Sequence, residues 1–390
     1  MGFRKSMCAA VLLGSISAAG CSSLIDRSLR RTPIEVTHVT SGQAHSCALT
    51  PAGEAHCWGL NSGGQVGSRP FGPTVSLPTP VEGRAFASLE AGDQHTCGIA
   101  VDGKAYCWGL NVDGQLGIGK AILLSWVPLP VSFPDPAVAI TAGAHHGCLL
   151  DRGGRAHCWG LNNLGELGQP PDSTVLPPTP VNTALRFTKI SAGWEHTCGL
   201  AEDGSAHCWG SNTFGQLGDG TTTNRDVPIQ VVTPPLTDLS AGTVHTCGVG
   251  VDGTAICWGG LASLALGRAA DEACLLHACT LPGPVDGDIR FDQITAGLAH
   301  TCGTADDGRA FCWGTGHSGA IGNCQTTPFW PSPEIVCGDH RFAQVSAGGD
   351  HTCGFTSDGE GWCWGANDNF QLGNTFFSSF GPRPIASPLP

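Results

Sequence analysis

Histidine and cysteine recur together in this sequence at a spacing that could support chemistry. In residues 196–218, HTCGLAEDGSAHCWGSNTFGQLG, His196 stands two residues before Cys198, and Cys208 follows ten residues later. Residues i and i+2 of a strand share one face, so these three side chains across a hairpin could bind zinc and leave one position open. The same cysteines could instead form a redox-active or a structural disulfide.

The pattern is repeated in seven similar segments of the chain. These segments begin at residues 45, 95, 146, 196, 245, 300 and 351. In each one the second cysteine belongs to a Cys-Trp-Gly tripeptide, and the tryptophans are Trp58, Trp108, Trp159, Trp209, Trp258, Trp313 and Trp364. Their mean spacing of 51 residues indicates one repeated structural unit.

Each repeat predicts short antiparallel strands, with almost no helical periodicity. In the fourth repeat, 197–201 and 206–209 predict two strands separated by the loop 202–204, EDG. A three-residue hairpin loop favours glycine at its last position, because the backbone there is left-handed. The segment 188–192 predicts a strand before the hairpin, and a proline-flanked strand such as 78–81 follows the N-x-x-G-Q-L-G loop.

A unit of about 50 residues with four strands has the size of one propeller blade. Seven blades can close into a ring, which removes the exposed sheet edges. We therefore expect an all-β fold, a seven-bladed β-propeller of four-stranded blades over residues 32–390. Pro33-Ile34 and Pro384-Ile385 compete for one strand position. The C-terminal pair is favoured, because its spacing from FQLG at 370–373 matches the internal repeats.

The motifs G-x-x-H-x-x-A/G-L, D-G and W-G-x-N-x-x-G-Q-L-G resemble the repeat of the regulator of chromosome condensation (RCC1) family, over essentially all of residues 32–390. The resemblance implies a seven-bladed propeller. The eukaryotic namesake is a chromatin-bound nucleotide exchange factor for a small GTPase, and other members are secreted bacterial propellers that inhibit β-lactamase through protein–protein contact. The cysteine pair in every repeat departs from the family pattern. Since propellers host unrelated activities, the resemblance specifies fold more closely than function.

The cysteine pattern favours structural disulfides over a metal or redox site. Folding the first hairpin about residue 52 places its two cysteines opposite each other, at the Cα separation of about 4.5–5.5 Å that a disulfide accepts. Seven identical half-open zinc sites would have no evident use. The predicted pairs are Cys47–Cys57, Cys97–Cys107, Cys148–Cys158, Cys198–Cys208, Cys247–Cys257, Cys302–Cys312 and Cys353–Cys363, with Cys274–Cys279 and Cys324–Cys337 in two long loops.

Residues 1–20 resemble a secretory signal peptide. Two basic residues precede an apolar run that is too short to span a membrane, and the segment SAAGC ending at Cys21 resembles a bacterial lipobox. Cleavage would remove Cys8 and leave Cys21 as a lipidated N-terminus, with residues 21–31 as a tether. A plain signal peptide with a free Cys21 is the alternative. The serine after Cys21 is typical of the outer-membrane class, so we expect an exported bacterial outer-membrane lipoprotein.

The charge restricts the kind of partner. The formal net charge is −13, and it becomes −15 when the two basic residues of the signal are removed. Such an acidic chain is not expected to bind nucleic acid. We expect a monomer that binds an unidentified protein, contacts the membrane only through its lipid anchor, and holds no cofactor or metal.

No catalytic constellation stands out in the sequence. GHSGA at 316–320 nearly matches the G-x-S-x-G nucleophile motif, but it occupies the N-x-x-G-Q position of the sixth repeat. DGTTTNRD at 219–226 lacks the D-x-D-x-D-G pattern of a calcium loop. The sequence favours a non-catalytic extracytoplasmic scaffold for protein interaction. The alternatives are a hydrolase with a site in the central channel and, by family resemblance only, a guanine-nucleotide exchange factor.

The two variable residues between Gly and His in each repeat are the best candidates for specificity. They recur once per blade, so they should form a ring on one face of the scaffold. We expect a partner site centred on Trp194 and Glu195, unless Trp194 simply packs on the adjacent loop. The site includes Asp93, Gln94, Leu298 and Asp350. Further candidates are Trp126, Phe329-Trp330 and Phe376-Phe377, and the loops 261–284 and 315–340.

Overall fold

The structure is a computed structural model that describes residues 34–68, 72–270, 274–275 and 277–386. Cys8, Cys21 and the expected signal and tether lie outside the described residues. Within the described part, the chain forms 28 strands and one short 3₁₀ turn, η1 (His317–Gly319). The described residues include no helix that is long and apolar enough to span a membrane.

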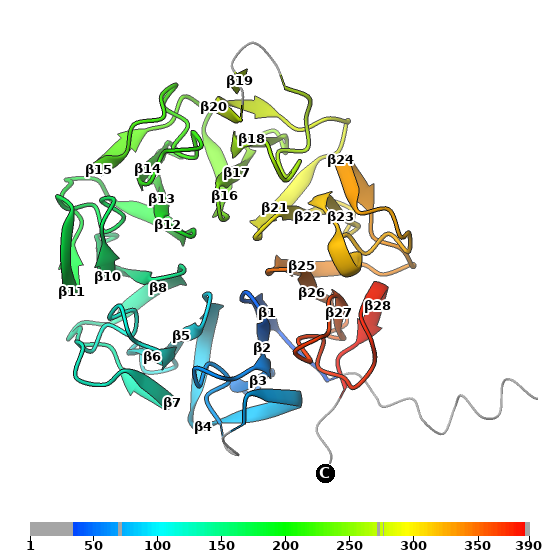
Figure 1. The fold of residues 1–390 in the computed structure, drawn as a ribbon, viewed down its shortest axis with the longest axis horizontal. Helices are drawn as coiled ribbons and strands as arrows, with labels where there is room; N and C mark the ends of the chain where they lie inside the picture. The colour runs from blue at the N-terminus through cyan, green and yellow to red at the C-terminus, as the bar shows by residue number, and fades with distance from the viewer. Residues whose placement is uncertain (1–33, 69–71, 271–273, 276, 387–390) are drawn as a thin grey trace, which may run out of the picture. The chain divides into compact units, whose positions relative to one another are not determined.

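Seven blades of antiparallel strands surround a central axis, which confirms the seven-bladed β-propeller expected from the sequence (Figure 1). The strands nearest the axis are β1 (His38–Ser41), β4 (Thr74–Ala91), β8 (Ala137–Ala142), β12 (Phe187–Ala192), β16 (Leu236–Ala241), β21 (Phe291–Ala296) and β25 (Phe342–Ala347). The second strands are β2 (His45–Leu49), β5 (His95–Ala100), β9 (His146–Asp151), β13 (His196–Ala201), β17 (His245–Gly250), β22 (His300–Ala305) and β26 (His351–Thr356).

The two outer strands complete each blade. The third strands are β3 (Glu54–Leu60), β6 (Ala105–Leu110), β10 (Ala156–Asn162), β14 (Ala206–Gly210), β18 (Ala255–Gly260), β23 (Ala310–Thr315) and β27 (Gly361–Gly365). The outermost strands are the first part of β4, β7 (Leu124–Pro130), β11 (Asp172–Pro180), β15 (Arg225–Gln230), β20 (Ala278–Pro284), β24 (Phe329–Ile335) and β28 (Ser379–Pro384). The fifth blade adds β19 (Cys274–Leu275), which pairs with β20.

The strand β4 joins the first two blades as one continuous element. It pairs with β3 from Thr74 to Ala85 and with β5 from Phe86 to Ala91. The remaining blades use separate outer and inner strands. The first two blades therefore share one seven-stranded sheet, while each blade keeps the same four-stranded arrangement.

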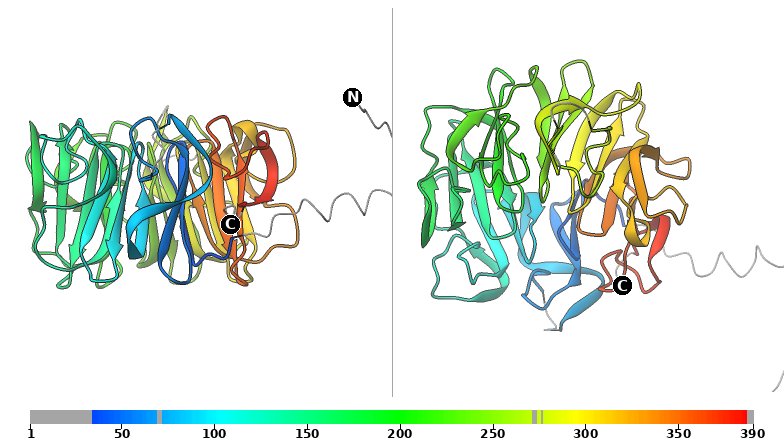
Figure 2. Two further views of the ribbon diagram at one scale, coloured as in Figure 1. Left: turned by 90° about the horizontal axis from the view of Figure 1, so that it is seen from below. Right: turned by 45° about the horizontal axis from the view of Figure 1, so that its top comes forward.

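The strand directions define two faces of the propeller. The first strand of each blade leads into the Gly-x-x-His turn, and the third strand leads into the N-x-x-G loop. Because alternate strands run the same way, both connections lie at one end of the blades, which we call the turn face. The Asp-Gly hairpins lie at the opposite end, the hairpin face. Figure 2 shows both ends of the blades from the side.

The hairpin turns have the backbone that the glycine pattern predicts. The last residue of the loop is a glycine with φ between 73° and 88° in all seven blades. This position also anchors the following blade, since Phe86 N donates to Gly53 O at 2.8 Å. The hairpins therefore close one blade and position the inner strand of the next.

A disulfide closes each of the seven hairpins, as the sequence predicts for the repeat. The paired cysteines are directly opposed in the register between the second and third strands, with Cα atoms 4.1 Å apart in every blade. Cys274–Cys279 joins β19 to β20, and Cys324–Cys337 closes a loop of the sixth blade. In the described part of the chain no three His, Cys, Asp or Glu side chains are grouped to hold a metal ion.

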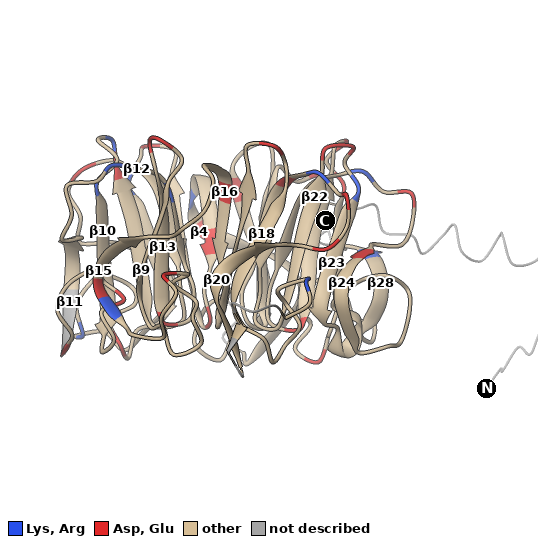
Figure 3. Cartoon of the chain, turned by 90° about the horizontal axis from the view of Figure 1, so that it is seen from above, with Lys and Arg blue, Asp and Glu red and all other residues tan. Residues whose placement is uncertain are grey.

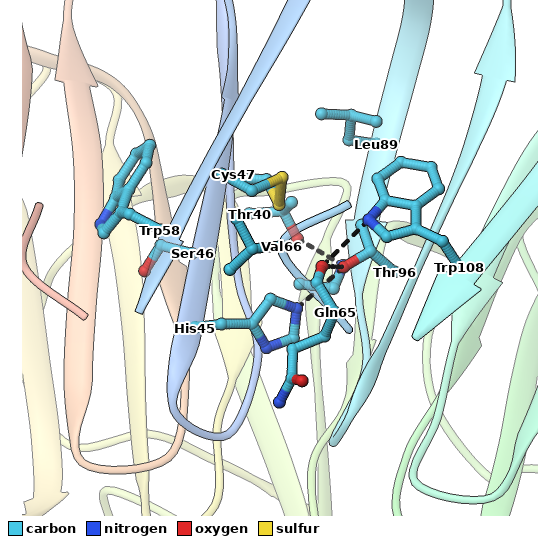
Figure 4. Close-up of a disulfide and its surroundings, with 12 residues drawn as sticks. Thr40, His45, Ser46, Cys47, Trp58, Gln65, Val66, Leu89, Thr96 and Trp108 are labelled. Carbon is cyan, nitrogen blue, oxygen red and sulfur yellow. Dashed lines mark hydrogen bonds between the residues drawn. A yellow bond between two sulfur atoms is a disulfide. The ribbon is translucent and has the colours of Figure 1, made fainter. Parts of the chain in front are cut away.

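Neighbouring blades are joined by a histidine, a hydroxyl and a tryptophan. His45 Nε2 lies 2.9 Å from Thr96 Oγ1, which is 2.8 Å from the Gln65 carbonyl, and Trp108 Nε1 donates to that same carbonyl at 3.0 Å (Figure 4). A carbonyl only accepts, so the Thr96 hydroxyl donates to it and accepts the proton of His45 Nε2. His45 Nε2 therefore carries a proton, and because burial lowers the pKa of His45 to about 3, the imidazole is neutral near pH 7.

The same bond recurs around the ring with one exception. The other five bonded pairs, at 2.8–2.9 Å, are His146–Thr197, His196–Thr246, His245–Thr301, His300–Thr352 and His351–Ser46. His95 faces Gly147, which has no hydroxyl, and its Nε2 is buried without a hydrogen-bond partner. Trp159 occupies the space, because a Cβ on Gly147 would lie 2.7 Å from its ring.

The ring closes between the seventh and the first blade. Pro384 lies opposite Trp362, so the C-terminal copy takes the outer-strand position that the repeat spacing favours. Val36 N donates to Gly359 O at 2.8 Å, which repeats the link between other neighbouring blades. Both ends of the described propeller therefore contribute to the closure.

Candidate partner-binding ring

The Gly-x-x-His turns are fixed in a ring around the axis. In each blade the glycine N–H donates to the histidine carbonyl at 2.8–2.9 Å. In five of the seven turns the next amide also donates to the turn glycine of the following blade, as from Trp194 N to Gly242 O at 3.2 Å. A Cβ on Gly193 would lie 2.3 Å from Gly242 O, so this close approach requires glycine.

The first variable residue of each turn lines one shallow opening, which we call the axial mouth. Its volume is about 450 Å³, including space open to solvent. The lining residues from this position are Gln43, Asp93, Ala144, Trp194, Thr243, Leu298 and Gly349. The structure therefore brings three of the predicted partner residues, Asp93, Trp194 and Leu298, to one surface, although they lie in different blades.

The second variable residues lie outside the lining of the mouth. Gln94 O accepts a hydrogen bond from Leu110 N at 2.9 Å, and Asp350 O accepts one from Ala366 N at 2.8 Å. Ser211 N donates in the same way to Glu195 O at 2.8 Å, so all three residues lie beside the ends of the third strands and outside the lining of the mouth. Asp350 is exposed, whereas Gln94 and Glu195 are partly buried.

Trp194 packs on the adjacent turn and also faces the mouth. Its ring meets that of His145 edge to face, with centroids 6.3 Å apart and an interplanar angle of 80°. His145 Nδ1 is in turn 2.9 Å from Asp113 Oδ2. The contact holds a large flat side chain in a fixed orientation, which lowers the entropy that binding a partner would cost.

Exposed apolar side chains extend the turn face beyond the mouth. Leu123, Phe329, Phe376 and Phe377, which lie at N-x-x-G loops or the strand starts after them, are 62%, 52%, 71% and 95% exposed. The other two aromatic candidates, Trp126 and Trp330, are partly buried. The described parts of the segments 261–284 and 315–340 begin at this face, after the third strands β18 and β23. Each segment then contains an outer strand, β20 or β24, which leads toward the hairpin face.

Charges of both signs lie at the hairpin face. Lys104, Arg155 and Arg309 flank hairpin turns, and Asp and Glu lie beside Lys and Arg along the edge of the propeller in Figure 3. On the turn face Arg225 is paired with Asp219 at 2.6 Å. Asp93 has a buried Oδ1 without a hydrogen-bond partner, and burial raises its pKa. Asp93 is the one titratable group among the described residues that line the mouth, so the mouth presents a carboxyl group and no cation of its own.

The central channel lies beneath the mouth, and none of its residues was predicted from the sequence. Side chains of the inner strands enclose about 760 Å³ there, including open space. The charged and titratable groups in its lining are His38, Glu90, Lys189 and Asp238. A comparison of the repeats could have found Glu90, because the other six repeats hold serine or threonine at its position.

The nucleophile-like segment has the loop position that the repeat pattern predicts. Ser318 lies in η1 with a φ of 56°. The ring of its neighbour His317 packs against Phe329, with centroids 5.7 Å apart. This arrangement supports the interpretation of GHSGA as a variant N-x-x-G-Q loop.

The fold and its ring of turns define a seven-bladed propeller that presents variable residues at one face. The RCC1-like domain family matches residues 19–282, and the regulator of chromosome condensation (RCC1) repeat matches 291–320, 307–354 and 342–371. The first match spans more than half of the chain. The protein therefore belongs to the RCC1-like domain family.

Individual relatives match only part of the chain. The human regulator of chromosome condensation is 33% identical over 107 residues, which cover 26% of this chain and 25% of the relative. The Arabidopsis thaliana ultraviolet-B receptor UVR8 is 33% identical over 89 residues, covering 22% and 20%. The chain thus spans a quarter or less of the length of these curated relatives.

Solved structures with the same architecture cover most of the propeller. Prp20p from Saccharomyces cerevisiae has a TM-score of 0.71 at 24% identity, covering 80% of each chain. Human WBSCR16 has a TM-score of 0.76 at 19% identity, covering 86% of this chain and 94% of the other. At these identities the likeness shows the fold.

Proposed function

We propose that this protein is a non-catalytic scaffold that binds a partner protein through the turn face, with Trp194 and Glu195 at the centre of the site. The observation that carries the proposal is the gathering of one variable residue per blade around the axial mouth. The backbone beneath these residues is fixed by bonds between blades. Variable side chains on a rigid scaffold are a common means of achieving specificity.

A partner surface with basic and apolar groups fits this face. Asp93, Glu195 and Asp350 supply carboxylates around the mouth, while Phe376 and Phe377 supply exposed apolar area. Opposite charges would quicken association at low salt. The study of Prp20p describes its binding to Gsp1p and to histones, which makes a protein partner a reasonable expectation for a related propeller.

The proposal includes export and a lipid anchor at Cys21. Nine disulfides in the described propeller are typical of a protein that folds in an oxidising compartment. The basic and apolar segment before Cys21 supports a lipoprotein signal. Cys21→Ser is expected to release the protein from membranes while the disulfides still form. Fractionation with the variant still in the membrane pellet would contradict the anchor.

The test identifies a partner by cross-linking in envelope extracts and then measures its affinity by calorimetry. Trp194→Ala is expected to weaken binding by about 2–4 kcal/mol, because it removes a rigid aromatic surface. Val251→Ala is the control, since Val251 is 69% exposed on the hairpin face. If Trp194→Ala folds normally and retains full affinity, the site lies instead on the loops 261–284 and 315–340.

A further inference from the structure

A ring of hydroxyl groups lines the channel and joins neighbouring blades. Six of the seven inner strands place a serine or threonine at the same position, and each hydroxyl oxygen accepts a backbone N–H of the next blade at 2.9–3.1 Å. The six residues are Thr40, Thr141, Ser191, Ser240, Thr295 and Ser346. In the second blade, Glu90 occupies this position.

Glu90 does not take over the structural role of the hydroxyls. Its carboxylate accepts no hydrogen bond from another described residue, and its side chain forms no bond to the third blade. The carboxylate lies in the lining of the channel, between the hydroxyls of Thr40 and Thr141 on the flanking blades. The side chain is therefore free to bind something within the channel.

The other charged groups that face the channel already have partners. Lys189 forms an ion pair with Asp238, whose Oδ2 also accepts the backbone N–H of Ile294 at 2.8 Å. His38 Nε2 lies 2.8 Å from the carbonyl of Leu89, to which it donates, and burial lowers the pKa of His38. With His38 neutral and Glu90 ionised, two carboxylates face one ammonium group, and the channel then has a net negative charge.

Burial makes the unpartnered carboxylate of Glu90 costly to ionise. Desolvation raises the pKa of Glu90 to about 7, although the charge of Lys189 acts in the opposite direction. A bound cation would compensate the desolvated charge and supply donors for the carboxylate. Gln293 lines the same channel and is exposed, so the cavity communicates with solvent.

We propose that the central channel binds an organic cation, an alkylammonium or guanidinium group, with Glu90 as its anionic ligand and the hydroxyls of Thr40 and Thr141 beside it. A free amine and a lysine or arginine side chain of another protein share this chemistry. The site is distinct from the partner-binding ring at the mouth and does not depend on it. An inorganic anion is disfavoured by the net negative charge of the channel.

The test uses the whole protein and calorimetric titration with n-butylammonium and n-propylguanidinium, with n-butanol as the neutral control. Both cations are expected to bind in a saturable manner, and the butanol is not. Glu90→Thr is the matched variant, because it restores the residue type of the other six blades and should fold well. Glu90→Thr is expected to lower the binding affinity for both cations at least about tenfold, which is the effect of losing one charge-assisted hydrogen bond.

The pH dependence and a peptide arm complete the experiment. Binding is expected to strengthen as the pH rises through about 7, as Glu90 ionises, and this dependence is expected to vanish in Glu90→Thr. An arginine-containing peptide that binds more tightly than n-propylguanidinium would identify a protein side chain as the source; equal or weaker binding would identify a free amine. The proposal would be overturned if the cations bound Glu90→Thr with the same affinity as the native protein. It would also be overturned if they did not bind the native protein. Neither result would bear on the turn face.

Discussion

Single hydroxyl groups hold neighbouring blades together in this propeller. Thr246 Oγ1 lies 2.9 Å from His196 Nε2 and 2.8 Å from the Gln216 carbonyl, which also accepts Trp258 Nε1–H at 2.9 Å. Thr246→Val keeps the shape of the side chain but leaves the buried N–H of His196 Nε2 without an acceptor. The Gln216 carbonyl still accepts the N–H of Trp258. We expect a loss of about 1–3 kcal/mol in the free energy of unfolding, measured by urea denaturation.

The matched control for this prediction is Thr246→Ser, because Ser46 performs the same role in the first blade. The serine variant should retain most of the stability that valine loses. Equal stability of the two variants would show that the hydroxyl contributes nothing. The native chain already has one such unpaired histidine, His95, so the ring tolerates the loss of one of these bonds.

At the scale of one element, the disulfide acts within a single hairpin. Cys198 and Cys208 are ten residues apart and directly opposed on β13 and β14. By chain entropy alone, a disulfide that closes such a short loop stabilises the folded state by about 2–3 kcal/mol. The stabilisation is smaller if the reduced hairpin stays compact. Replacing both cysteines by alanine should lower stability by no more than this amount and should accelerate hydrogen exchange mainly in the fourth blade.

The element-scale prediction is checked by urea denaturation together with hydrogen exchange and intact mass. The mature native protein should contain no free thiol under non-reducing conditions, apart from a Cys21 that is not lipidated. Exchange that rises equally in all blades would show that the disulfide stabilises the ring rather than its own hairpin. Free thiols at the repeat positions would overturn the assignment of structural disulfides.

At the scale of the whole molecule, seven buried histidines make the stability depend on pH. Burial lowers the pKa to about 3 for His45, His95, His146, His196, His245 and His351, and to about 4 for His300. The unfolded chain takes up protons near pH 6.5, but the folded ring does not. The free energy of unfolding therefore falls as the pH drops below about 6.5, by up to about 1.4 kcal/mol per pH unit for each histidine.

Urea denaturation at a series of pH values from neutral to about 5 measures this dependence, and its slope gives the number of protons taken up on unfolding. We expect a cooperative loss of structure in mild acid, with an uptake of several protons, because all seven interfaces belong to one closed ring. Midpoints that stay constant over this range would show that the ring histidines are not held neutral by the fold.

The sequence by itself determined the features that arise within one repeat. The hairpins, their left-handed glycines and the opposed cysteines are all set by residues no more than about ten positions apart, where local geometry leaves few alternatives. The period of 51 residues gave the size of one blade, and the seven copies of the pattern gave the number of blades. Because the same pattern occurs seven times, chance variation in one copy could not obscure it.

Tertiary structure alone decided which variable residues meet. Asp93, Trp194 and Leu298 are far apart in the chain, and only closure of the ring brings them to one mouth. In the sequence Glu90 is one acidic residue of a predicted strand. The neighbouring blades place it in a channel that is also lined by hydroxyl groups. The physical reason is that contacts between blades join residues about one repeat apart, and the periodic pattern that defines each blade does not specify what its neighbour presents.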